Sequence, residues 1–193
     1  INSYGANSVY HPELQLSPNI HASEDLNEVV EGSSVILVAT PSLIFENILE
    51  RIANNISVGA HIISCTKGIK LDPFRSMSDI IFNNINTNDN QVGVLSGPNL
   101  AREIADKKVA GTVIASDSEN LINDVKKILS SDTFKIYSSN DIQGVELAGA
   151  LKNIYAIICG MADSLEVGEN AVGLILTRSM AEMSRFAVAK GAN

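Results

Sequence analysis

The chain has 193 residues, of which 45% are hydrophobic, and it carries a formal net charge of −8 at pH 7. This length and apolar content allow a substantial hydrophobic core, in one domain or in two small ones. The acidic balance argues against a nucleic-acid partner, which normally requires a basic face, although a few local lysines and backbone amides can still hold a small anionic ligand.

Cysteine spacing and apolar runs restrict the remaining classes of protein. Cys65 and Cys159 match no metal or redox spacing, so we expect two free thiols in a reducing compartment and no metal site. No charged leader with an apolar run opens the chain, and no apolar run reaches the ~20 residues of a membrane span. We therefore predict a soluble cytoplasmic protein with no membrane span. Because the chain begins at Ile1 and stops at Asn193 directly after a helical pattern, we interpret it as a segment of a longer protein.

Strand-like and helix-like segments alternate through the first two thirds of the chain. Apolar runs of strand length occur at 34–39, 61–65, 91–95, 112–115 and 134–137. Helical spacing of apolar residues follows them at 41–56, 74–85, 99–107 and 120–129. Uniformly apolar strands separated by helices predict a parallel or mostly parallel sheet that is covered on both faces. The asparagine-rich stretch 83–90 is typical of an exposed turn.

After residue 139 the pattern becomes helical. Asp141 can cap a long helix that runs to about residue 163, and a second helix is predicted over 170–190. The second helix carries an apolar stripe that we interpret as ordinary core, formed by Val172, Ile175, Leu176, Met180, Met183 and Phe186. The sequence thus predicts a partial Rossmann-like α/β domain over 1–138, and the first helices of an all-α substrate domain over 139–193.

Three of the predicted strands end in small or polar loops. These are Thr40-Pro41 after the first strand, Thr66-Lys67-Gly68 after the second and Gly97-Pro98-Asn99 after the third. If the strands are parallel, the three loops share the carboxyl edge of the sheet, where open α/β sheets bind ligands. Lys67 then lies beside the N-terminus of the helix near Asn99, whose free amides favour an anion or a carbonyl oxygen. The alternative is three routine turns, since Gly, Pro, Ser and Asn are common there.

Lys152 is a lysine inside an apolar run, residues 144–160. An unpaired buried ammonium is costly, so this group must reach either solvent or a polar cavity. Desolvation lowers the pKa of a lysine and makes it suitable for proton transfer near neutral pH. The alternative is a surface lysine whose stem lies along an amphipathic helix.

Five stretches in register carry a resemblance to a known family. They are VATPS at 38–42, CTKG at 65–68, LSGPNLARE at 95–103, GVELAGALKN at 144–153 and TRSMAEMSR at 177–185. With these, the sequence resembles the NAD(P)-dependent glycerol-3-phosphate dehydrogenases, most closely the bacterial form. The family begins with a glycine-rich βαβ unit, but no Gly-x-Gly-x-x-Gly occurs in this chain. The resemblance implies that the chain starts after that unit and stops before much of the helical domain.

The resemblance also implies roles for single residues. Lys152 matches the family's proton acceptor or donor, and Asn153 lies beside it in the site. Lys67 matches a lysine that touches both the nicotinamide cofactor and the substrate. The remaining matches bind substrate or cofactor: substrate at Gly97 and Asn99, and cofactor at Ala101, with Thr40 and Pro41 also expected there. Asn99 stands where bacterial relatives often have Thr or Ser.

The implied reaction interconverts sn-glycerol 3-phosphate and dihydroxyacetone phosphate and supplies glycerophospholipid synthesis. Hydride comes from NAD or NADP, Lys152 transfers the proton, and Lys67 stabilises the developing alkoxide. The chain is also expected to form a homodimer in the complete enzyme. Two alternatives stay open: a truncated, non-catalytic module of this enzyme, and a related two-domain dehydrogenase with another substrate. The choice between NAD and NADP also stays open, because the residue that decides it normally lies near the missing second strand.

Overall fold

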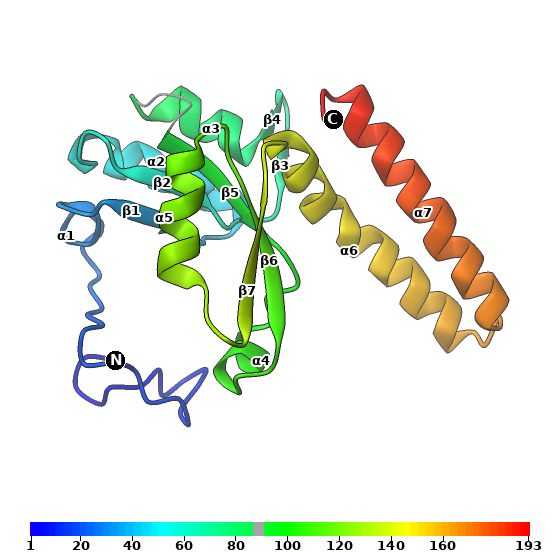
Figure 1. Cartoon of the computed structure of the whole chain (residues 1–193), viewed down its shortest axis with the longest axis horizontal. Coiled ribbons are helices and arrows are strands. Elements are labelled where there is room, and N and C mark those ends of the chain that lie inside the picture. The colour runs from blue at the N-terminus through cyan, green and yellow to red at the C-terminus, as the bar shows by residue number, and fades with distance from the viewer. Residues whose placement is uncertain (87–90) are drawn as a thin grey trace.

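A five-stranded sheet forms the centre of the computed structural model, which describes residues 1–86 and 91–193 (Figure 1). The strands lie in the order β1-β2-β5-β6-β7, and every neighbouring pair is parallel except β5–β6. The prediction of a mostly parallel sheet is therefore confirmed. The bounds are β1 (Val35–Val38), β2 (His61–Ser64), β5 (Val92–Ser96), β6 (Ala110–Ala115) and β7 (Phe134–Ser139).

Except for α1, which the sequence pattern did not predict, the helices follow the predicted order, with small shifts at their ends. The short 3₁₀ turn η1 (Ala53–Asn55) continues helix α2. Asp141 caps helix α6, because its side chain accepts a hydrogen bond from the Gly144 amide at 2.9 Å. The bounds are α1 (Leu26–Val30), α2 (Ser42–Ile52), α3 (Met77–Asn84), α4 (Ala101–Ala105), α5 (Glu119–Leu129), α6 (Ile142–Ser164) and α7 (Glu169–Ala189).

Two apolar layers cover the two faces of the sheet. Ile62 and Ile63 are successive residues of β2, so their side chains point to opposite faces. Ile62 packs in one cluster with Phe45 of α2 and residues of α3, and Ile63 packs in a second cluster with Leu121 of α5. All four side chains are fully buried. The α/β part of the chain thus holds its own core on both faces of the sheet.

The segment after Lys67 forms a hairpin that the sequence did not predict. Strands β3 (Ile69–Leu71) and β4 (Phe74–Ser76) pair antiparallel, so the prediction of a helix from residue 74 is wrong for its first three residues. The helix begins later because Ser76 is its N-cap, and Ser76 and Asp79 form a capping box. Asn83 and Asn84 belong to α3 rather than to a turn, and residues 87–90 of the predicted turn lie outside the described residues.

Helices α6 and α7 form a hairpin that extends away from the sheet (Figure 1). The prediction that the apolar stripe of α7 is ordinary core is wrong, because Leu176 and Met180 are exposed and the others are only half-buried. The physical reason is that α7 packs mainly on α6, which leaves its other sides uncovered.

Helix α6 joins the α/β part to the hairpin. Its first half contacts β5, β6 and β4, which lie before the predicted domain boundary in the chain. Because these contacts cross that boundary, the division into domains at residues 138 and 139 stays a prediction. Among the described residues, α6 is also one helix long and apolar enough to cross a membrane by length and composition, with a mean hydropathy of 1.3 in its most apolar window. A core helix of a soluble protein passes the same test, so the absence of a membrane span also stays a prediction.

Candidate active site

The loops after β1, β2 and β5 lie at one edge of the sheet, as the sequence predicts. The three strands are neighbours and run parallel. The Thr66 hydroxyl donates a hydrogen bond to the Thr40 carbonyl oxygen at 2.7 Å, which fastens the first two loops to each other. The Thr40 hydroxyl oxygen is itself buried without a hydrogen-bond partner among the described residues. This edge therefore offers a buried polar atom whose hydrogen-bonding capacity is not used.

Gly97 and Asn99 are held against the start of β6. A Cβ atom at Gly97 would lie 2.7 Å from the Thr112 Cα and 2.8 Å from the Gly111 carbonyl oxygen. The backbone of β6 therefore requires glycine at this position. The Asn99 side-chain amide donates to the Thr112 hydroxyl at 3.1 Å, while its buried carbonyl oxygen Oδ1 has no partner among the described residues. Asn99 is thus oriented with one acceptor left open.

Helix α4 is shorter than the sequence suggests. It spans only Ala101–Ala105, and its N-cap Leu100 makes no side-chain hydrogen bond. Ala101 and Pro41, both expected to contact a cofactor, are exposed to solvent. A helix of five residues has a weak dipole, so the prediction that its N-terminus attracts an anion has little support here.

Lys152 is brought to the same edge by the close approach of α6 to β5. A Cβ atom at Gly149 would lie 2.4 Å from the Ser96 hydroxyl oxygen and 4.0 Å from the Lys67 Cγ. A methyl group at position 149 would have to displace the Ser96 hydroxyl, so glycine lets the helix lie against the end of β5 and near the Lys67 side chain. Lys152 follows three residues later, on the same helical face, and is half-buried.

Lys152 is close enough to Lys67 for its charge to affect the pKa of Lys67. Partial burial lowers the pKa of Lys67, and the positive charge of Lys152 lowers it further. Among the described residues, neither amine donates a hydrogen bond or forms an ion pair. The structure thus brings together the two amines that the sequence singled out.

A pocket of about 300 Å³ lies where these elements meet. It is lined by Ser96, Gly97, Pro98, Val113, Val145, Ala148, Gly149, Lys152 and Met183. Sequence reasoning missed Met183, because its stripe on α7 was interpreted as core. The available signal was the hairpin itself: Lys152 and Met183 are nearly equidistant from the turn at 165–168. Asn153, predicted beside Lys152, is exposed and does not line this pocket.

Other reactive side chains lie outside this pocket. Both cysteines are free, as predicted, and burial raises the pKa of the Cys65 thiol to about 11. His61 contacts Asp124 at 3.2 Å on another part of the sheet. In the described part of the chain, no group of three or more His, Cys, Asp or Glu could hold a metal ion.

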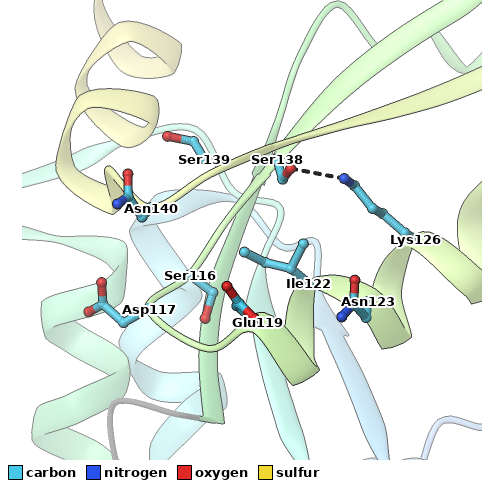
Figure 2. Close-up of a pocket in the computed structure, with 9 residues that line it drawn as sticks. All are labelled: Ser116, Asp117, Glu119, Ile122, Asn123, Lys126, Ser138, Ser139 and Asn140. Atoms are coloured by element: carbon cyan, nitrogen blue, oxygen red, sulfur yellow. Dashed lines mark hydrogen bonds between the residues drawn. The ribbon is translucent and has the colours of Figure 1, made fainter.

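A larger pocket, of about 600 Å³, lies at the opposite edge of the sheet, where β6 and β7 end (Figure 2). Its lining is mainly polar, and Lys126 of α5 donates a hydrogen bond to the Ser138 hydroxyl at 2.9 Å. This pocket could not be predicted from the sequence, because β6 was not expected to run antiparallel to β5. None of the predicted site residues lines it.

The chain matches one protein family along most of its length. Residues 1–122 match the family model described as NAD-dependent glycerol-3-phosphate dehydrogenase N-terminus, and residues 141–193 match that of the C-terminus. All 193 residues align with the glycerol-3-phosphate dehydrogenase (NAD(P)+) of Alcanivorax borkumensis at 46% identity and with that of Acinetobacter baylyi at 47% identity. The chain covers 56% and 53% of these two proteins, so it spans about half the length of the curated relatives it matches.

Solved structures give the same result. The crystal structure of glycerol-3-phosphate dehydrogenase from Coxiella burnetii matches all of this chain with a TM-score of 0.89 at 31% identity, and 58% of that chain is covered. The Plasmodium falciparum glycerol-3-phosphate dehydrogenase matches 95% of this chain with a TM-score of 0.88 at 28% identity, and 51% of that chain is covered.

Proposed function

Because the chain belongs to the NAD-dependent glycerol-3-phosphate dehydrogenase family, we propose that it serves an enzyme that interconverts sn-glycerol 3-phosphate and dihydroxyacetone phosphate. The observation that carries this proposal is the convergence of Lys67 and Lys152, from two different elements, at one edge of the sheet. The two bacterial relatives described above are named glycerol-3-phosphate dehydrogenases, and their alignments include every residue of the chain.

Two buried polar atoms support the binding of NAD or NADP and substrate at this edge. The Thr40 hydroxyl and the Asn99 Oδ1 lack partners among the described residues, and each can hydrogen-bond a bound molecule. Thr40, Pro41, Ala101 and Lys67 would hold the cofactor. When bound, NAD or NADP supplies or accepts the hydride.

In this proposal, Lys152 transfers the proton and Lys67 stabilises the negative charge. In the reducing direction, the Lys152 ammonium donates a proton to the alkoxide oxygen that develops at C2 of dihydroxyacetone phosphate. Lys67 stabilises the same negative charge by its position in a partly desolvated site. In the oxidising direction, neutral Lys152 removes the proton of the C2 hydroxyl. Gly97 and Asn99 bind the substrate beside the two amines, and Asn153 completes the surroundings of Lys152.

We extend the proposal to the protein's place in the cell. An enzyme of this kind supplies glycerol 3-phosphate for glycerophospholipid synthesis, and a soluble cytoplasmic homodimer is the form we expect. Its direct partner is a small phosphorylated triose or glycerol.

Lys152→Ala tests the proposal in the protein expressed at its full natural length. Loss of the proton donor lowers kcat for dihydroxyacetone phosphate by about 10²–10⁴-fold, while cofactor affinity stays nearly unchanged. Initial rates of nicotinamide oxidation and a cofactor fluorescence titration measure the two quantities. The matched control is Lys127→Ala, which removes an exposed lysine of α5 far from the site. A Lys152→Ala protein that keeps most of its activity would remove Lys152 from this role.

A further inference from the structure

Glu146 is a buried carboxylate that the proposed reaction does not use. It lies in the first half of α6 and is 5% exposed. Its Oε1 accepts a hydrogen bond from the Ser78 backbone amide at 3.0 Å, and its Oε2 accepts one from the Ser78 hydroxyl. Burial raises the pKa of the Glu146 carboxyl, and the hydrogen bonds from Ser78 oppose that change. A buried carboxylate destabilises the fold unless well-placed hydrogen-bond donors compensate for the loss of its hydration.

The partner of Glu146 leads directly to Lys67. Ser78 lies in the first turn of α3, and its hydroxyl is 2.9 Å from the hydroxyl of Ser76, the N-cap of that helix. Ser76 is also the last residue of β4 and pairs with Ile69 of β3. Ile69 follows Lys67 by two residues. One short chain of contacts therefore connects the Glu146 carboxylate with the loop that carries the Lys67 amine.

The same glutamate is connected to Lys152 through α6 itself. Gly149, which packs against Ser96, follows Glu146 by three residues, and Lys152 follows by six. Leu147, next to Glu146, is buried in a cluster with Ala187 and Ala192, against which Ile69 of the β3–β4 hairpin packs. Glu146 and Leu147 thus fix the start of α6 against the hairpin that follows Lys67.

We propose that Glu146 is a positioning residue that holds the amines of Lys152 and Lys67 at a fixed separation by binding the N-terminus of α3. Its effect on turnover rests on the proposed function, but its effect on the spacing of the two amines does not. An apolar residue at this position leaves the buried Ser78 amide unsatisfied, and α6 then settles in another place.

The protonation of Lys67 reports the spacing without any need for activity. In the protein of full natural length, the pKa of Lys67 is measured by labelling with acetic anhydride at a series of pH values and quantifying the labelled peptide by mass spectrometry. Lys152→Met removes the neighbouring charge and raises the pKa of Lys67. Glu146→Ala moves α6 and also raises it. In the double variant Glu146→Ala/Lys152→Met, the Glu146→Ala change raises the pKa of Lys67 by less than it does alone, because the repulsion between the two lysines is already removed.

Conservative and control variants separate positioning from general damage. Glu146→Gln can still accept from the Ser78 amide and donate to its hydroxyl, so it keeps the pKa of Lys67 near the wild-type value. If Glu146→Ala fails to fold, Ser78→Ala removes one of the two hydrogen bonds and shifts the pKa of Lys67 in the same direction by less. Glu50→Ala, an exposed glutamate of α2, is the matched control and changes nothing. A pKa of Lys67 that responds to Lys152→Met but not to Glu146→Ala or Ser78→Ala overturns the proposal.

Kinetics then connects the spacing to turnover. Glu146→Ala lowers kcat by up to about 10²-fold, the effect of a misplaced reacting group, and changes KM much less. Glu146→Gln restores most of kcat. An unchanged kcat with a shifted pKa of Lys67 overturns the catalytic part of the inference. A wild-type protein that does not turn over dihydroxyacetone phosphate refutes the proposed function instead, and the labelling result still decides whether Glu146 spaces the amines.

Discussion

The α/β part of the chain and the α6–α7 hairpin differ in how they bury apolar side chains. Phe45, Leu49 and Ile81 are fully buried between the sheet and its helices, whereas Ile157 is 64% exposed and Met161 60% exposed on the far half of α6. The near half of α6 resembles the first region rather than the second, because it packs on β5, β6 and β4. The predicted site residues of α6 therefore lie in the half of the helix that packs on the sheet, and the far half carries none of them.

Paired truncations in the two regions give the largest contrast. Phe45→Ala removes a fully buried ring and lowers the free energy of unfolding by about 3–5 kcal/mol. Ile157→Ala removes an exposed side chain and changes it by about 0.5 kcal/mol or less. Urea unfolding of both variants, followed by circular dichroism, measures the difference. A cost above about 2 kcal/mol for Ile157→Ala would mean that the far half of α6 is covered in solution, and the contrast between the regions would fail.

Two of the three glycines of α6, Gly149 and Gly160, give a second contrast within one helix. A Cβ atom at Gly149 meets the Ser96 hydroxyl oxygen at 2.4 Å, while a Cβ atom at Gly160 meets nothing within 4 Å. Gly149→Ala therefore destabilises the protein by about 1–3 kcal/mol through overpacking. Gly160→Ala stabilises it by about 0.5–1 kcal/mol, since alanine loses less conformational freedom on folding.

Removal of the clashing oxygen tests the cause of the Gly149 effect. The Ser96 Cβ lies 3.6 Å from the added methyl group, which is an ordinary contact, so Ser96→Ala leaves room for it. We expect the double variant Gly149→Ala/Ser96→Ala to regain most of the lost stability in the same urea titrations. If the double variant is as unstable as Gly149→Ala alone, then the close approach of α6 to β5 is not what requires glycine.

Much of this arrangement could be predicted from the sequence, for identifiable reasons. The apolar strands, the cap at Asp141 and the shared edge of the loops after β1, β2 and β5 follow from local patterns. The reversal of β6 could not be predicted, because the five residues of α4 form too short a crossover, and the sequence overstates that helix. Hairpin β3–β4 was missed because its strands have three residues each. Short strands carry almost no periodic signal.

In the candidate site too, features with a local sequence signal could be predicted and features without one could not. Lys67, Lys152 and Gly97 could be singled out as candidates because a lysine in an apolar run and a glycine after a strand stand out from their neighbours. Glu146 could not be found, because a glutamate one turn into a helix has the appearance of a surface residue until its partner, 68 residues earlier in the chain, is known. The requirement for glycine at Gly97 was likewise explained only by the backbone of β6, which the sequence does not place.

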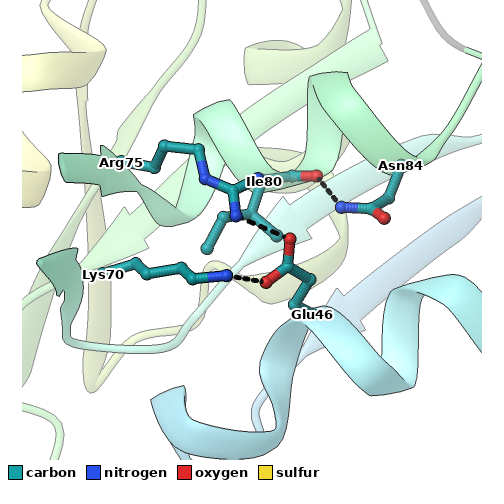
Figure 3. A network of polar contacts seen from close by, with 5 residues as sticks. All are labelled: Glu46, Lys70, Arg75, Ile80 and Asn84. Carbon is teal, nitrogen blue, oxygen red and sulfur yellow. Dashed lines mark hydrogen bonds and ion pairs between the residues drawn. The ribbon is translucent and has the colours of Figure 1, made fainter. Parts of the chain in front are cut away.

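The smallest expected effect concerns the ion pairs that fasten the β3–β4 hairpin to α2. Glu46 accepts from Lys70 at 2.5 Å and from Arg75 at 2.8 Å (Figure 3). The hydrogen bond from Lys70 lowers the pKa of Glu46 below its ordinary value of 4.5; partial burial opposes this, and Arg75 adds to the lowering. A carboxyl whose pKa is lowered on folding stabilises the protein above its unfolded pKa, and that contribution is lost as the pH falls through the folded value.

Glu46→Gln therefore costs less than about 1 kcal/mol at pH 7, as expected for partly exposed ion pairs, and the difference from wild type disappears as the pH falls below 4. Urea titrations at pH 7, 5 and 3 measure this trend, and Glu50→Gln on the same helix serves as the control with no such pH dependence. This hairpin also packs on the α6–α7 region through Ile69, and Lys190 Nζ lies 4.5 Å from the centre of the Phe74 ring. The result therefore measures how much the ion pairs to α2 stabilise a hairpin that contacts both regions. A Glu46→Gln cost that persists at pH 3 would show that the glutamate acts by packing rather than by its charge.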